Sequence, residues 1–196
     1  MQSGECALSC GRDAEGHAAS YCLIVASGDD LRLVGLAREG SMDAFGELFS
    51  RYAREAWRAA YAVCGSTGLA DEVVQDAFER VVGKFDQFDA KRGFGPWLHR
   101  IVMNRALDVL RRERRFRASE PGEPRAPEST GGSGFLDLIA GLEAERRVVV
   151  VLRYGLGYPP AAIAELLDLP VGTVHSRLAR ALRDLRAQTE ASLSDG

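Results

Sequence analysis

The sequence has few of the side chains that usually carry covalent chemistry. It contains three histidines in 196 residues, and His17, His99 and His175 lie in unrelated segments. A Gly-rich phosphate-binding loop and an HExxH zinc motif are both absent. We therefore predict that the chain is not an enzyme and needs no cofactor.

Long apolar runs are also missing. No run approaches the roughly 20 residues that a membrane-spanning helix needs. The first residues, MQSGECALSC, lack the basic region of a secretory signal, and CLIVA is too short to be its apolar core. A content of 46% apolar and 27% charged residues is typical of globular proteins. We expect a cytoplasmic protein without membrane insertion.

Cysteine is scarce, and its spacing does not predict a metal site. Cys64 precedes a glycine at an expected helix end, where a small buried residue fits. Cys6, Cys10 and Cys22, with His17 among them, could bind zinc or sense redox state, but their spacing matches no common zinc framework. The alternative is that residues 1–27 form a disordered extension without such a role. We adopt this interpretation and expect the first domain to begin at residue 28.

The net charge of −3 argues against indiscriminate binding to polyanions, but the charge is unevenly distributed. Positive charge, nearly all arginine, concentrates in residues 92–117 and 177–186. Negative charge concentrates in residues 71–89, on the polar face of an expected helix and in the loop that follows it. Basic faces separated by an acidic helix indicate two kinds of partner, nucleic acid and protein.

The apolar residues recur at helical spacing, and no strand pattern is present, so we predict an all-α fold. Ser41 is placed to cap a helix that ends at Gly65. Further helices are expected at residues 29–38, 69–85, 96–117, 143–154, 161–167 and 172–187. Residues 118–134 have the Pro, Gly, Ser and Glu content of a flexible linker. This linker separates two small helical domains, residues 28–117 and 135–190.

The helix at residues 96–117 has two unlike faces. Its apolar face consists of Leu98, Ile101, Val102, Ala106 and Val109. The opposite face carries Arg100, Asn104, Arg111 and Arg115, which is a set suited to a phosphate backbone because guanidinium groups fit phosphate oxygens. The alternative is a basic face that is simply solvated.

The last two helices have the dimensions of a helix-turn-helix. In the second of them, Val174, Leu178, Ala181 and Leu185 form the packed stripe. The exposed side carries Thr173, Ser176, Arg177, Arg180 and Arg183, as in a recognition helix. Thr173 lies at the helix start, where unpaired N–H groups favour a phosphate. An ordinary surface hairpin of helices is the alternative.

Four segments together resemble a known family. They are LVGLAREGSMDAFGELFSRYA, ADEVVQDAFERVV, WLHRIVMNRALDVLRRERR and PVGTVHSRLARALRDL, with a linker between the last two. In this order they resemble a bacterial RNA polymerase sigma factor of the extracytoplasmic-function group. The resemblance spans residues 29–186 and implies a factor that binds core RNA polymerase, directs it to promoters and promotes initiation, in response to a stress or envelope signal.

The resemblance also implies roles for individual residues. Contacts with the polymerase β′ clamp helices fall on Asp71, Glu72, Gln75, Asp76 and Glu79. Contacts with the minus-ten element fall on Arg100, Asn104, Arg111 and Arg115, with Asn104 near a flipped-out base. Trp97 is either an aromatic that assists melting or a core residue. Contacts with the minus-thirty-five element fall on Thr173, His175, Ser176, Arg177 and Arg180, although His175 stands where the family usually has Lys or Arg.

Further partners implied by the family are the β flap, which the second domain contacts, and an anti-sigma protein that restrains the factor. The main alternative is a stand-alone helix-turn-helix regulator that binds duplex DNA without polymerase. That alternative explains residues 160–186 but leaves residues 69–117 without a role.

Overall fold

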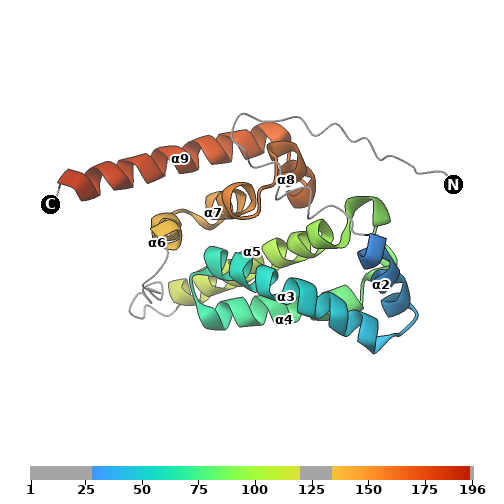
Figure 1. The fold of residues 1–196 in the computed structure, drawn as a ribbon. Helices are drawn as coiled ribbons and strands as arrows, with labels where there is room; N and C mark the ends of the chain where they lie inside the picture. Colours follow the sequence, from blue (N-terminus) through green and yellow to red (C-terminus); the bar gives the residue numbers. More distant parts are fainter. Residues whose placement is uncertain (1–27, 120–133, 195–196) are drawn as a thin grey trace.

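The computed structural model describes residues 28–119 and 134–194, and every regular element in those ranges is helical (Figure 1). The all-α prediction is confirmed. The first domain consists of α2 (Gly28–Arg38), α3 (Met42–Cys64), α4 (Thr67–Val82) and α5 (Phe94–Ser119). Two short turns, η1 (Phe85–Gln87) and η2 (Ala90–Arg92), join α4 to α5. Cys6, Cys10, Cys22 and His17 lie outside the described residues.

The ends of α3 follow the predicted capping chemistry. The Ser41 hydroxyl accepts a hydrogen bond from the Ala44 N–H at 3.3 Å. Gly65 has a φ of 68°, and its N–H donates to the Tyr61 carbonyl. At this end of the helix Cys64 is buried, and burial raises the pKa of its thiol to about 12.

A buried carboxylate joins α2 to α3. The Asp30 side chain is only 2% exposed, and it accepts hydrogen bonds from the Arg51 guanidinium and the Tyr52 hydroxyl. Arg51 also contacts Asp29 at 2.9 Å and Glu47 at 3.0 Å. Burial and the Asp30 carboxylate raise the pKa of Tyr52, so its hydroxyl stays protonated and able to donate. The shared carboxylate therefore fixes α2 on the first half of α3.

The second domain consists of α6 (Gly134–Ala140), α7 (Ala144–Val150), η3 (Val151–Gly155), α8 (Pro160–Leu167) and α9 (Val171–Ser194). The helix expected at residues 143–154 is present, but its second half is a π-helical segment, η3. The last helix extends past the predicted residue 187 to Ser194. Asp168, in the left-handed conformation with a φ of 55°, makes the turn from α8 to α9.

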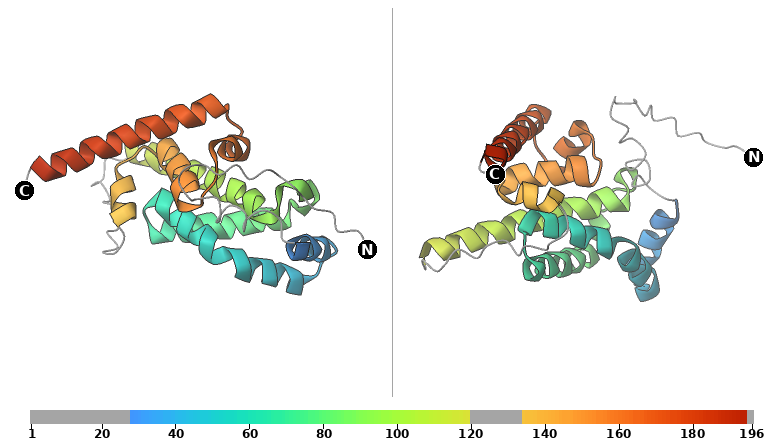
Figure 2. Two further views of the ribbon diagram at one scale, coloured as in Figure 1. Left: turned by 45° about the horizontal axis from the view of Figure 1, so that its top comes forward. Right: turned by 60° about the vertical axis from the view of Figure 1, so that its left-hand side comes forward.

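The two domains contact each other closely. Helices α6 to α9 form a layer that lies over α2 to α5 (Figures 1 and 2). Helix α5 contacts α7 and α8, while α3 contacts α6, α7 and η3, so the buried side chains of both domains form one continuous core. The sequence predicted two domains but not this contact between them. Their exact boundaries stay a prediction, since residues 120–133 lie outside the described ranges.

A polar junction is buried where the domains meet. The His99 ring on α5 is fully buried, and its Nδ1 lies 2.8 Å from the Tyr158 hydroxyl, which precedes α8. Its Nε2 lies 3.1 Å from a Glu55 carboxylate oxygen on α3. The interaction with His99 holds the pKa of the Glu55 carboxyl below its ordinary value.

We expect a Glu55→Gln substitution to flatten the acid dependence of the free energy of unfolding. A carboxyl whose pKa falls on folding stabilises the folded state above its ordinary pKa, and that contribution is lost as pH falls through the lower folded value. Between about pH 5 and pH 3, the wild-type free energy should therefore fall more steeply than that of the variant. Urea titrations at each pH measure both slopes, with the exposed Glu39→Gln as control. Identical slopes for all three proteins would contradict the assignment.

In the described parts of the chain, no helix is long and apolar enough to cross a lipid bilayer.

Candidate nucleic-acid interface

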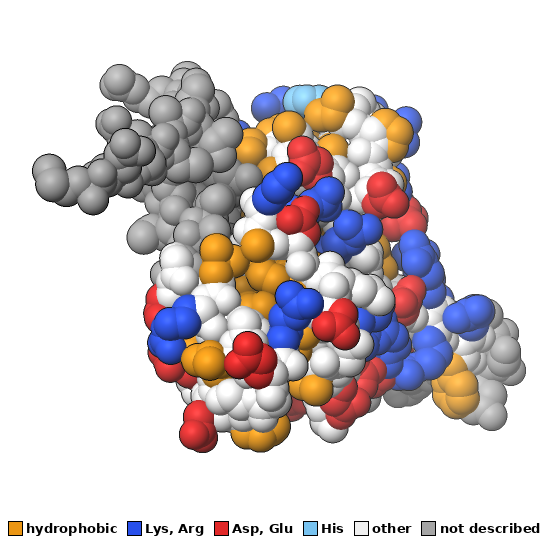
Figure 3. All heavy atoms as spheres, turned by 90° about the vertical axis from the view of Figure 1, so that its right-hand side faces the viewer, with side chains coloured by type: hydrophobic (Ala, Val, Ile, Leu, Met, Phe, Trp, Pro, Cys, Tyr) orange, Lys and Arg blue, Asp and Glu red, His pale blue; other side chains and the backbone are white. Residues whose placement is uncertain are grey.

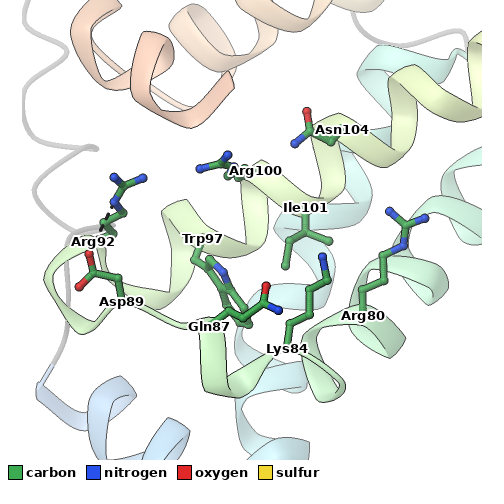
Figure 4. A pocket seen from close by; sticks show the side chains of 9 residues that line it. All are labelled: Arg80, Lys84, Gln87, Asp89, Arg92, Trp97, Arg100, Ile101 and Asn104. Atoms are coloured by element: carbon green, nitrogen blue, oxygen red, sulfur yellow. Dashed lines mark ion pairs between the residues drawn. The ribbon is translucent and has the colours of Figure 1, made fainter. Parts of the chain in front are cut away.

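A pocket of about 530 Å³ lies where the end of α4, the η1–η2 loop and the start of α5 meet. Its lining residues are Arg80, Lys84, Gln87, Asp89, Arg92, Trp97, Arg100, Ile101 and Asn104. Figure 4 shows Arg92, Arg100 and Asn104 along one side of the pocket. Arg80, Lys84 and Gln87 line the opposite side, with Trp97 and Ile101 between the two rows (Figure 4). The pocket therefore has an apolar floor between two polar, mostly basic rims.

Positive charge dominates the pocket. Among the lining residues, Arg80, Lys84, Arg92 and Arg100 are basic, and Asp89 is the acidic one. Asp89 contacts Arg92 at 3.7 Å, and its carboxylate also accepts a hydrogen bond from the Lys91 N–H at 3.0 Å. These contacts stabilise the η2 turn and partly neutralise the Asp89 charge. The net positive rims suit a phosphate backbone, and the Asn104 amide offers both a donor and an acceptor to a base edge.

Trp97 belongs both to the core and to the pocket. Its half-buried ring contacts the rings of Phe85, Phe88 and Phe94, with centroid separations of 6.2, 5.3 and 5.9 Å. Phe94 is fully buried and begins α5, so it is a core residue rather than a contact for melted DNA. This aromatic cluster fixes the η1–η2 loop against α5. The partly exposed Trp97 side chain also lines the pocket, between its two rims (Figure 4).

The pocket contains some of the residues predicted to contact the minus-ten element, lacks others, and includes several that were not predicted. Trp97, Arg100 and Asn104 line the pocket as a group, whereas Arg111 and Arg115 lie farther along α5 and outside it. Arg80, Lys84 and Gln87 were not predicted, whereas Arg92 belongs to the basic stretch at residues 92–117 that the sequence shows. A sequence signal existed, because basic residues flank the loop between the acidic and the basic helix on both sides.

The predicted recognition helix is the first half of α9. Its apolar stripe, Val174, Leu178, Ala181 and Leu185, is buried as expected. His175, Ser176 and Arg180 are exposed, and Thr173 is partly buried. The Ser176 hydroxyl donates to the Thr173 carbonyl at 2.9 Å. Arg177 is more buried than expected and contacts Glu145 of α7 at 3.6 Å.

The five polar residues of α4 that are predicted to contact polymerase differ in how exposed they are. Asp71, Gln75 and Glu79 are exposed. Glu72 and Asp76 are partly buried and face α5 instead. Glu72 contacts Arg105 at 3.1 Å and Arg112 at 2.8 Å, and Asp76 also pairs with Arg105.

On the face drawn in Figure 3, acidic and basic side chains alternate and do not form one uninterrupted charged surface. Across residues 28–119 and 134–194, no group of three or more His, Cys, Asp or Glu side chains is arranged to hold a metal ion.

Two protein-family models match the chain. Sigma-70 region 2 matches residues 48–116, which contain the pocket and the acidic face of α4. Sigma-70 region 4 matches residues 134–185, which contain the helix-turn-helix. The two matches fall on the two helical domains and leave the intervening residues unmatched.

Full-length relatives match across both domains. An extracytoplasmic-function (ECF) sigma factor, SigM of Mycobacterium tuberculosis, is 33% identical over 82% of this chain and 87% of its own length. SigW of Bacillus subtilis, another ECF sigma factor, is 28% identical over 77% of this chain and 91% of its own length. The stand-alone regulator is therefore not favoured, because the similarity includes the first domain.

A solved structure has the same fold. CnrH, in complex with the cytosolic domain of CnrY, is 29% identical, with a TM-score of 0.63 over 83% of this chain and 98% of its own. A second, the sigma factor RpoE of Bartonella quintana, is 20% identical with a TM-score of 0.61 and supports the fold alone. The chain belongs to the sigma-70 family of RNA polymerase sigma factors, and within it to the extracytoplasmic-function group.

Proposed function

We propose that the pocket between α4 and α5 holds unpaired bases of the minus-ten element while α9 reads the minus-thirty-five element in duplex form. The chain acts in the cytoplasm and performs no covalent chemistry of its own. The observation that carries this proposal is the pocket itself, in which the Asn104 amide, the Trp97 ring and four basic side chains converge.

The pocket chemistry suits a single strand better than a duplex. Extruding a base from a duplex costs a few kcal/mol, and stacking on an aromatic ring recovers about 1–3 kcal/mol per base. Trp97 supplies such a surface, and Asn104 is placed to hydrogen-bond the base edge. Arg100 on one rim and Lys84 on the other supply phosphate contacts. Arg111 and Arg115, farther along α5, extend the basic path for the backbone.

We propose that core polymerase contacts α4 mainly through Asp71, Gln75 and Glu79, which are the exposed members of the set on that helix. Glu72 and Asp76 already pair with arginines of α5. They stabilise the packing of α4 on α5, and they would reach the β′ clamp helices only after those ion pairs rearrange. The second domain would contact the β flap.

We also propose an anti-sigma protein as a partner. CnrH, which shares this fold at 29% identity, was solved in complex with the cytosolic domain of CnrY. A chain that covers 98% of CnrH offers the same set of helices to a protein of that kind.

Site-specific photocrosslinking tests the pocket assignment. A photoreactive amino acid replaces Gln87, which is exposed and lines the pocket, and a matched variant carries it at Asp43, an exposed position in the first turn of α3 outside the pocket. With core polymerase and a promoter mapped for this factor, the Gln87 position should crosslink to the non-template strand in the minus-ten region, and the Asp43 position should not. Crosslinking from both positions, or from neither, would contradict the assignment.

We expect Arg180→Ala to weaken binding to the minus-thirty-five element by about 1–3 kcal/mol if this side chain reads a base. Arg180 is exposed, whereas Arg177 must leave Glu145 before it reaches DNA, so Arg177→Ala should have the smaller effect. Fluorescence anisotropy with the matched duplex measures both losses, and competition by single-base variants shows where sequence preference relaxes. An unchanged preference among competitors would show that Arg180 contacts phosphate only.

A further inference from the structure

We propose that Arg105 of α5 is a positioning residue for strand capture, because it fixes how α4 lies against α5 and so places the two rims of the pocket relative to each other. The proposal rests on the function proposed above, since the rims are assigned there to the minus-ten strand. Arg105 is not among the residues that line the pocket. It acts through the side chains that α4 and α5 contribute to the two rims.

Arg105 joins the two helices through two carboxylates. Its side chain is 16% exposed, and one guanidinium nitrogen lies 3.1 Å from a carboxylate oxygen of Glu72 and also pairs with Asp76. Both carboxylates belong to α4 and lie about one helical turn apart. Arg112, about two turns farther along α5, contacts the same Glu72 at 2.8 Å, but its side chain is 52% exposed. Arg105 is therefore the more buried of these two connections between α5 and α4.

This bridge lies next to the pocket. Asp76 precedes Arg80 by four residues on α4, and Arg105 follows Ile101 by four residues on α5. Residues four apart on a helix share a face, and Arg80 and Ile101 both line the pocket. The bridge thus connects the two helices one turn beyond the pocket. It controls how Arg80 on one rim is placed relative to Asn104 on the other (Figure 4).

The apolar contact between α4 and α5 defines this placement less closely than the bridge does. The two helices contact each other, and their buried side chains include Val73, Ala77, Val102 and Ala106. Burial of apolar surface is non-directional, so it favours contact without selecting one rotation of α4. A planar guanidinium that meets two carboxylates is directional. The ion pairs of Arg105 therefore select one arrangement of the rims.

The bridge should contribute little to the stability of the fold. Its charges are partly removed from water, and among the described residues the buried Nε of Arg105 has no hydrogen-bond partner. Replacing a buried ion pair by apolar side chains of similar volume is often neutral or stabilising, provided that no unpaired charge stays buried. After loss of Arg105, Glu72 keeps Arg112 and the 31% exposed Asp76 side chain can be hydrated. Placement and stability can therefore be measured separately.

The test compares Arg105→Met with Arg112→Met, which removes an arginine contact to the same Glu72. Each chain is saturated with core polymerase, and fluorescence anisotropy measures its affinity for a labelled single strand that carries the minus-ten region of a mapped promoter. We expect Arg105→Met to weaken strand binding about tenfold and Arg112→Met to match the wild type. Arg105→Lys, which keeps the charge but loses the planar fork, should fall between Arg105→Met and the wild type.

A stability measurement distinguishes positioning from a structural role. In urea titrations of the free chain, Arg105→Met should have a free energy of unfolding equal to that of the wild type or higher. If it loses stability together with strand affinity, or if Arg112→Met loses as much affinity, Arg105 has no positioning role. Unchanged strand affinity for Arg105→Met would also overturn the proposal.

Two further variants complete the test. Asp76→Asn removes a carboxylate partner of Arg105 and should also weaken strand binding by the saturated holoenzyme, whereas unchanged or tighter binding would show that Arg105 does not act through α4. Asn104→Ala separates this proposal from the function on which it rests. If Asn104→Ala has no effect on strand affinity, the pocket assignment is wrong, and if it weakens binding while Arg105→Met does not, only the positioning role is refuted.

Discussion

The double substitution Arg100→Ala with Asn104→Ala is expected to reduce open-complex formation by about 100-fold or more. The two side chains lie about one helical turn apart on α5 and line the same side of the pocket (Figure 4). Loss of a base-edge contact costs about 1–3 kcal/mol, and loss of a charge-assisted phosphate contact adds to it. Single-round transcription from a mapped promoter, with permanganate footprinting of unpaired thymines, measures the effect.

Two controls make this result specific to the pocket. Lys91→Ala removes a positive charge from the η2 turn beside the pocket without altering a lining residue, and it should change initiation little. Core polymerase should bind the double variant as tightly as the wild type, because the exposed polar face of α4 is unchanged. If core binding falls in parallel with initiation, Arg100 and Asn104 do not act in strand capture.

An Asp30→Ala variant is expected to lose about 3 kcal/mol of the free energy of unfolding. Removing one member of a buried ion pair typically costs about 3–5 kcal/mol. The lower end applies here because Arg51 keeps contacts with Asp29 and Glu47, while the Tyr52 hydroxyl loses the acceptor that the structure gives it. Urea-induced unfolding measures the loss.

Asp29→Ala is the matched control, because Asp29 also contacts Arg51 but lies in solvent, and its removal should cost much less. Equal losses for the two variants would show that burial of Asp30 does not set its contribution. Helix α2 also contacts η1, and Arg38 lies 3.4 Å from Asp86 there. Loosening α2 should therefore disturb the loop that lines the pocket as well as the stability of the domain.

Local features of the fold could be predicted from the sequence because their causes lie within a few residues. Ser41 and Gly65 define the ends of α3 through one side-chain hydrogen bond and one left-handed residue. The apolar stripe of α5 follows from helical spacing, and four of its five predicted residues are fully buried. The same spacing placed Arg100 and Asn104 on one face, where the pocket contains both.

The contacts between distant segments could not be predicted in this way. His99 and Tyr158 are 59 residues apart, and neither segment alone indicates that the pair is buried. The sequence pattern places Glu72 and Asp76 with Asp71 and Glu79 on one polar face, although the first two face arginines of α5. Which side of a polar face meets a neighbouring helix depends on how α4 lies against α5. The position of Arg80 and Lys84 at the pocket likewise depends on how α4 lies against α5.

The most direct test of the central claim mixes the purified chain with core RNA polymerase and follows both association and transcription. We expect the chain to co-elute with the core enzyme and to direct run-off transcripts from a limited set of genomic promoters, with mapped start sites that share upstream elements. A chain that does not bind the core enzyme, or that binds it without producing any new start site, would contradict the claim that this protein directs polymerase to promoters.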